Sequence, residues 1–131
     1  MNKIVEELKK TGVFYLATVE GDLPRVRPFG AIAEIEGKAY TCTNNTKDVY
    51  AQLMKNPNAE LCGMEKDGTW VRVKTKLIRD DRDEIRAEML EKNPSLKSMY
   101  HVGDGIFEVL YFEKPVCVKY SFTAAPVVVE E

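Results

Sequence analysis

Two arginines separated by one residue are the clearest sign of chemistry in this sequence. Residues that alternate along a strand share one face, so Arg25 and Arg27 share a face with the apolar residues that follow them. A planar guanidinium at the mouth of an apolar face suits a phosphate group. We therefore predict an anion site on the face that carries Arg25, Arg27, Phe29, Ala31, Ala33 and Ile35.

The residues around these arginines interrupt the expected strand. Pro28 removes a backbone donor, and Gly30 permits the close approach of a ligand to the backbone. We include Val26 and Phe29 in the predicted binding segment because they lie between these residues. The alternative is an edge strand that contains a bulge and carries solvated arginines.

A second group of polar residues lies where a predicted strand passes into a helix. Helix N-termini present free N–H groups and a positive dipole end, which favour phosphate binding. Hydroxyl, amide and ammonium donors follow one another here, and the candidates are Thr43, Asn44, Thr46 and Lys47. The alternative is ordinary helix capping by Asn45 or Thr46. If the two segments are adjacent strands of one meander, they form a single phosphate site.

A third segment alternates between two chemical characters. Val71, Val73, Thr75 and Leu77 share one face of a predicted strand, and Trp70 shares the other with Arg72, Lys74 and Lys76. A tryptophan beside three cations favours a contact with a second subunit or with the edge of a ligand. The alternative is a solvated basic strand with Trp70 covering the end of a barrel.

No metal site or catalytic triad is indicated. His101 is the only histidine and has no cysteine near it, and we interpret it as a loop or helix-end residue. The scattered cysteines Cys42, Cys62 and Cys117 form neither a disulfide framework nor a CxxC pair. We name no catalytic residue, and we expect Met89, Met99, Tyr111 and Phe112 in the core.

Length and charge limit the classes of function. The chain has 131 residues, of which 44% are hydrophobic, and its net charge is −2. We expect one domain over residues 1–131, no nucleic-acid partner and no membrane span. The charged N-terminus lacks the apolar stretch of a signal peptide, so we expect a cytoplasmic protein. So small a core has little room for a large cofactor, which suggests that a second chain completes any such site.

Periodicity predicts a mainly β fold with a few helices. Expected helices cover residues 2–10 and 46–55, a third follows an Asp81–Glu84 capping box, and a short one begins at Ser95. Expected strands cover 13–19, 25–35, 39–43, 59–65, 69–79, 106–113 and 116–122, the last two forming a hairpin. The tail from about residue 124 is expected to be loose. Antiparallel strands with inserted helices indicate a small barrel or curled sheet.

These segments resemble the FMN-binding split β-barrel proteins related to pyridoxamine 5′-phosphate oxidase, in their short single-domain form. The resemblance rests on FYLATVEGDLPRVRPFG, AYTCTNNTKDVYAQLMKNP, TWVRV and IFEVLYFEKPVCVKYSF, in that order. It implies a split barrel of antiparallel strands with peripheral helices, a homodimer, and FMN at the dimer interface. The PRVRPFG strand would follow the flavin ring.

The resemblance also implies roles for single residues. Arg25 or Arg27 would reach toward the ring or phosphate, and Thr46 and Lys47 would carry the phosphate with Thr43 or Asn44. Trp70 and Arg72 would approach the flavin from the interface. The C-terminus, YSFTAAPVVVEE, lacks the basic motif of the full oxidases, so true pyridoxamine-phosphate oxidase activity is not expected.

Three functions remain open from the sequence. The first is an FMN-dependent oxidoreductase that passes electrons from a reduced nicotinamide or similar donor to a small acceptor, with nitro-aromatic compounds as one possible class. The second is a non-catalytic protein that binds flavin, haem or a deazaflavin, with His101 as the only candidate haem ligand. The third is a structural dimer that keeps only a remnant of the phosphate site.

Overall fold

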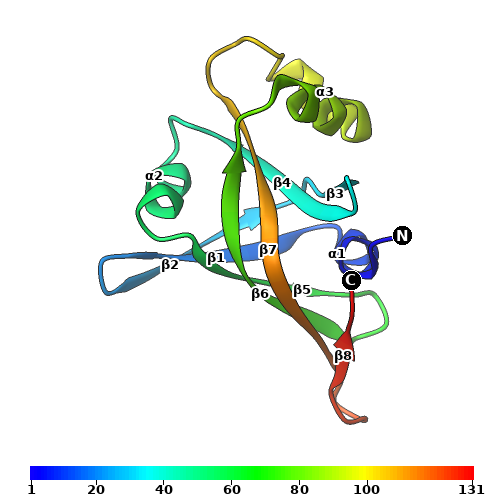
Figure 1. The fold of residues 1–131 in the computed structure, drawn as a ribbon. Coiled ribbons are helices and arrows are strands. Elements are labelled where there is room, and N and C mark those ends of the chain that lie inside the picture. Colours follow the sequence, from blue (N-terminus) through cyan, green and yellow to red (C-terminus); the bar gives the residue numbers. More distant parts are fainter.

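The computed structural model describes residues 1–131 and consists of one curled antiparallel sheet with helices at its periphery (Figure 1). The sheet has eight strands, and seven of them follow the order β2-β1-β5-β6-β7-β4-β3, while β8 pairs with β7. The strands are β1 Phe14–Glu20, β2 Leu23–Phe29, β3 Ala33–Ile35, β4 Lys38–Asn44, β5 Asn58–Met64, β6 Trp70–Asp80, β7 Phe107–Tyr120 and β8 Val127–Val129. The predicted fold class, mainly β with peripheral helices, is confirmed.

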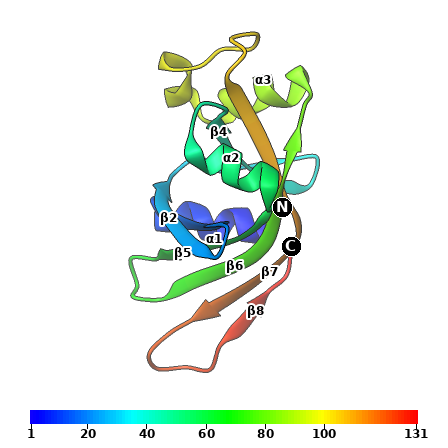
Figure 2. The same cartoon turned by 90° about the vertical axis from the view of Figure 1, so that its left-hand side faces the viewer.

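Three α-helices and one 3₁₀ helix lie around the sheet: α1 Lys3–Thr11, α2 Asp48–Lys55, α3 Asp83–Lys92 and η1 Pro94–Ser98. Figure 2 shows α1 lying inside the curve of the sheet. The α1 helix begins after Asn2, whose side chain accepts a hydrogen bond from the Val5 amide, and ends at Gly12, where φ is +70°. Glycine suits that left-handed conformation because it has no Cβ.

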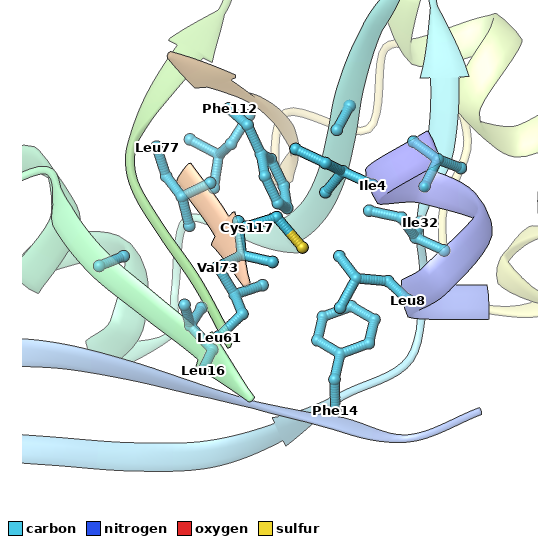
Figure 3. Close-up of a cluster of buried hydrophobic side chains, with 14 of the residues drawn as sticks. Ile4, Leu8, Phe14, Leu16, Ile32, Leu61, Val73, Leu77, Phe112 and Cys117 are labelled. Carbon is cyan, nitrogen blue, oxygen red and sulfur yellow. The ribbon is translucent and has the colours of Figure 1, made fainter. Parts of the chain in front are cut away.

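Alternating apolar residues build the core between α1 and the sheet. Ile4 and Leu8 of α1 pack on inward-facing side chains of the sheet (Figure 3). In β6 the predicted alternation is confirmed, with Val71, Val73, Thr75 and Leu77 buried. A second buried cluster lies under α3 and includes Met89. Met99 is 61% exposed, so its expected place in the core is wrong.

The expected long strand over residues 25–35 is instead two strands at opposite ends of the sheet order. β2 pairs with β1, and β3 pairs with β4. The chain leaves the ladder after Phe29 and crosses between the sheet edges through residues 30–32, so no three-strand meander forms. Of the residues that interrupt the pattern, Pro28 lies just before this crossing and Gly30 is its first residue.

The expected hairpin around Lys114 and Pro115 is also wrong. β7 runs unbroken through both residues, and the register against β6 shifts between Lys74 and Lys76. Lys114 has a positive φ of 44°, and the Thr75 hydroxyl donates to the Glu113 carbonyl at 2.8 Å. A bulge tolerates proline because the extra residue is left out of the ladder.

Three further expectations need correction at element ends. α2 begins after Lys47 and α3 after Arg82, and neither residue makes a side-chain capping bond. The capping by Asn45 or Thr46 and the Asp81–Glu84 capping box are therefore wrong. Residues 127–129 pair with β7 as β8, and Val129 packs on the core, so this part of the tail is not loose.

A partly buried ionic contact links α1 to the sheet. The Lys119 ammonium donates to Glu7 at 3.1 Å and to Glu65 at 3.3 Å, while the other oxygen of Glu65 is buried without a hydrogen-bond partner. Burial, together with the neighbouring carboxyl of Glu7, raises the pKa of Glu65. The folded protein therefore holds the Glu65 proton more tightly than the unfolded chain does.

This raised pKa makes the stability depend on pH. The stabilisation that comes from the raised pKa of Glu65 is fully present at a pH below the ordinary pKa of glutamate. It is lost as the pH rises through the raised pKa. We expect Glu65→Gln to remove this loss, so that urea unfolding at about pH 5 and about pH 8 gives a smaller decline than in the wild type. The Glu88→Gln variant, at a partly exposed glutamate of α3, should keep the wild-type decline. An equal decline in Glu65→Gln would contradict this role.

Candidate functional site

The β1–β2 hairpin turns both arginines toward the inside of the barrel. Arg27 lies opposite Leu16 and Arg25 lies opposite Thr18, and both partners are buried. Directly opposed residues of an antiparallel pair share a face. The prediction that the two arginines share the inward face with Phe29 is therefore confirmed, although the face ends with β2.

Arg27 is a half-buried cation without a carboxylate partner. Its guanidinium donates to the Thr18 hydroxyl at 2.7 Å, to the Gln52 side-chain oxygen at 2.7 Å and to the Leu16 carbonyl at 3.2 Å. Burial lowers the pKa of Arg27, and the positive charge of Arg25 lowers it further. All three acceptors are neutral, so the charge is oriented by the protein but not neutralised by a direct partner.

Arg25 has a different environment, although it lies on the same face. Its guanidinium donates to Glu20 at 2.8 and 3.0 Å, and both side chains are about half exposed. This exposed ion pair already neutralises Arg25 in large part. Of the two predicted arginines, Arg27 is therefore the one that has no ion-pair partner and can bind an external anion.

These residues line a cleft of about 540 Å³ between β2 and the beginning of α2. Lys47, directly before α2, reaches this cleft and makes no ion pair. The residues that line the cleft are Glu20, Arg25, Val26, Arg27, Pro28, Phe29, Lys47, Asp48, Val49 and Gln52. β2 and β4 are not adjacent strands, so the two predicted segments meet because α2 packs on β1. We call this space the phosphate cleft.

A smaller and more apolar cavity of about 170 Å³ adjoins the phosphate cleft. The two spaces share Pro28, Phe29 and Lys47. The remaining lining residues are Gly30, Ala31, Cys42, Thr43, Leu96, Met99 and Tyr100. We call this space the ring cavity.

The Thr43 hydroxyl gives the ring cavity an unusual polar feature. Thr43 is only 4% exposed, and its Oγ1 is buried without any hydrogen-bond partner. Buried hydroxyls are nearly always bonded, because leaving one unbonded costs about 1–3 kcal/mol. A ligand in this cavity would find a polar group that the protein itself does not use.

Several predicted residues lie outside both spaces. Asn44 and Thr46 bond to one another, since the Asn44 side-chain oxygen accepts from the Thr46 amide at 3.1 Å and from its hydroxyl at 2.5 Å. Trp70 and Arg72 lie on the outer face of β6, where Trp70 stacks on Tyr120 at 5.7 Å between ring centroids. Within one chain, neither pair contributes to the clefts.

Two functional candidates were missed by reasoning from the sequence alone. Gln52 is buried on the inward face of α2 and bonds both Thr18 and Arg27. Its position three residues after Val49, on the apolar stripe, was a usable signal. Tyr100 lines the ring cavity and accepts a hydrogen bond from Asn44 at 2.8 Å. No local pattern predicts this contact, because it joins residues far apart in the chain.

The structure groups no three His, Cys, Asp or Glu side chains in a way that could hold a metal ion. None of the helices combines the length and the apolar composition needed to cross a bilayer. His101 is exposed, and its Nδ1 lies 3.1 Å from the Val102 carbonyl oxygen, outside both clefts.

Comparison with known proteins adds a family and several similar structures. The sequence model described as pyridoxamine 5′-phosphate oxidase matches residues 1–104. A crystal structure of a NimC/NimA family protein from Clostridium acetobutylicum is 50% identical, with a TM-score of 0.96, and the match covers 98% of this chain and 90% of that chain. No curated protein matches the sequence.

Two more distant structures share the fold. A pyridoxamine 5′-phosphate oxidase-related, FMN binding protein from Nostoc punctiforme has a TM-score of 0.71 at 15% identity, covering 95% of this chain and 85% of that chain. A heme binding protein from Mycobacterium smegmatis has a TM-score of 0.74 at 18% identity, covering 96% of this chain and 57% of that chain. At such low identity these likenesses show the fold alone.

The unbonded hydroxyl of Thr43 leads to a prediction about stability. We expect Thr43→Val to raise the free energy of unfolding by about 1 kcal/mol, because a methyl group replaces a buried, unsatisfied donor of the same shape. Thr41→Val is the matched control on the same strand: its hydroxyl donates to the Ala31 carbonyl at 2.8 Å, so its loss should destabilise. Urea unfolding measures both, and a loss of stability in Thr43→Val comparable to that of the control would contradict the assignment.

Proposed function

Because the chain belongs to the pyridoxamine 5′-phosphate oxidase family, we propose that it is an FMN-binding oxidoreductase. The phosphate of FMN would bind in the phosphate cleft, and the flavin ring would lie along Pro28–Gly30 toward the ring cavity. Bound FMN would supply the electron-accepting and electron-donating chemistry, while the protein binds and orients it.

One observation carries this proposal: two cations without carboxylate partners line the same cleft. Arg27 is held by neutral acceptors, and Lys47 makes no ion pair. A phosphate monoester would give both cations an anionic partner, and its remaining oxygens could accept hydrogen bonds from backbone amides at the beginning of α2. Asp48 and Glu20 also line the cleft, so the binding relies on Arg27 and Lys47 rather than on a broad positive field.

The residues beside the ring fit a flavin in a second way. A flat, mainly apolar ring with polar edges suits a cavity of apolar side chains that contains one unbonded hydroxyl, that of Thr43. Burial raises the pKa of the Cys42 thiol to about 12, so this residue stays protonated and unreactive near neutral pH. The protein's part in the ring cavity is therefore to bind and position the flavin.

A reduced nicotinamide or similar donor and a small acceptor, such as a nitro-aromatic compound, complete the proposed reaction. We do not propose oxidation of pyridoxamine phosphate. The segment after Tyr120 contains no lysine or arginine that could hold the phosphate of a second substrate, and three of its residues form β8.

We further propose a homodimer formed through the outer face of the sheet. Paired residues form one continuous row across six strands on this face: Pro28, Tyr15, Cys62, Arg72, Val118 and Val128. Tyr15 is 52% exposed and Val128 61%, and Trp70 lies beside the row. A mainly apolar exposed row that includes aromatic and arginine side chains is typical of an interface. The row begins at Pro28, which also lines both clefts, so a partner's Trp70 or Arg72 could approach the flavin.

Haem binding is the second function that the fold family allows. His101, the only histidine, lines neither cleft, so no histidine ligand faces the proposed site. A Soret band that appears when haem is added and disappears in His101→Ala would favour haem over FMN.

The phosphate assignment predicts how single substitutions change affinity. We expect Arg27→Ala and Lys47→Ala each to weaken FMN binding by about 1.5–3 kcal/mol, tenfold or more, because each removes a charged contact to the phosphate. The affinity for riboflavin, which has no phosphate, should fall much less. Quenching of flavin fluorescence measures both affinities. Lys55→Ala, at the other end of α2, is the control, and unchanged FMN affinity in both test variants would refute the assignment.

The dimer assignment predicts a change in mass and in affinity together. We expect Val118→Glu to shift the protein from dimer to monomer in sedimentation analysis, because it puts a charge into the mainly apolar row, directly beside Val128. FMN affinity should fall in the same variant if a partner residue completes the site. Met54→Glu, on the exposed side of α2, should remain a dimer. A wild-type protein that sediments as a monomer would rule out this interface.

A further inference from the structure

The turn that joins β4 to α2 is fastened from behind by Asn45. The Asn45 amide donates to the Ile106 carbonyl at 2.9 Å. Its side chain donates to the Gly105 carbonyl at 2.9 Å and to Glu108 Oε2 at 3.0 Å. All three bonds point away from the phosphate cleft and toward the beginning of β7, so Asn45 lines neither cleft.

Glu108 is itself rigidly held. It is 4% exposed and accepts from Arg79 Nε at 2.9 Å and from Arg86 Nη2 at 3.0 Å. Burial opposes ionisation, but hydrogen bonds from Arg79, Asn45 and Arg86 outweigh it and hold the pKa of Glu108 below its ordinary value. Glu108 also lies directly opposite Thr43 in the β4–β7 ladder. One buried carboxylate is thus adjacent to both ends of the Thr43–Asn45 segment.

The turn between β4 and α2 also determines where the Lys47 side chain lies. The Lys47 side chain makes no hydrogen bond or ion pair that would orient it, and its amide donates to the Asn44 carbonyl at 3.3 Å. The direction of its side chain therefore depends on the Lys47 backbone, which is held by the turn on one side and by α2 on the other, where the Tyr50 amide donates to the Lys47 carbonyl at 3.1 Å. If that backbone were free to move, phosphate binding would have to order it, and affinity would fall.

From this arrangement we propose that Glu108, acting through Asn45, is a positioning residue for phosphate binding. It holds the turn so that Lys47 reaches the phosphate cleft before any ligand arrives. This inference rests on the proposed FMN site. It also separates the roles of the TNNTK residues: Thr43 and Lys47 line the clefts, while Asn45 holds the turn through Glu108.

The test uses paired titrations of FMN and riboflavin with the full chain. We expect Asn45→Ala to weaken FMN binding about five- to tenfold and to change riboflavin binding by less than about twofold, because it acts on the phosphate alone. In the Lys47→Ala background the same substitution should have much less effect, since it acts mainly through Lys47. A purely structural role would change the two ligands alike.

Several controls keep the outcomes distinct. Asn58→Ala, at an exposed asparagine of β5, should leave the ratio of FMN to riboflavin affinity unchanged. Faster hydrogen exchange at the Lys47 amide in ligand-free Asn45→Ala would show the loosened turn directly. If Asn45→Ala does not fold, Glu108→Gln replaces it and should lower the same ratio.

Two results would overturn the inference alone. One is FMN affinity in Asn45→Ala equal to that of the wild type. The other is a double variant whose loss is the product of the two single losses. A wild-type protein that binds neither flavin would instead contradict the proposed function, and the positioning role would fall with it.

Discussion

An arginine that the protein orients without neutralising is the constraint on which the rest of the site depends. Arg27 lies inside the mouth of the barrel, where charge is costly, and its hydrogen bonds go only to Thr18, Gln52 and a backbone carbonyl. The barrel can hold such a group because β1 and α2 together supply these acceptors, and the Thr18 hydroxyl also donates to the Gln52 side-chain oxygen at 2.6 Å. Stability alone gives little reason for this arrangement, whereas an external anion explains it.

The fold produces this arrangement by a crossing of the chain between the two edges of the sheet. β2 and β3 are at opposite ends of the sheet order, and the chain crosses between them directly after the arginine strand. That crossing places Gly30 and Ala31 beside the turn that leads into α2, where Thr43 and Lys47 lie. The polar cleft and the apolar cavity therefore meet at Pro28 and Phe29, which gives room for a ligand with a charged end and a flat end.

The sequence was informative where local chemistry decides the structure. The strand alternation that placed Arg25 and Arg27 inward, and Trp70 and Arg72 outward, needs only the two-residue period. It was less informative where distant contacts decide. Pro115 suggests a turn, but β6 lies alongside and converts the break into a bulge. Asn44 has the chemistry of a phosphate ligand, yet its side chain is occupied by Thr46 and Tyr100. The difference between Arg25 and Arg27 likewise depends on Glu20 and Gln52, which no spacing rule identifies.

The absorption spectrum of the purified protein, before and after addition of FMN, tests the central claim most directly. The account predicts a yellow protein, or one that takes up added FMN with a changed flavin spectrum, and that releases FMN on denaturation. A colourless protein whose addition leaves the spectrum of FMN unchanged would contradict it.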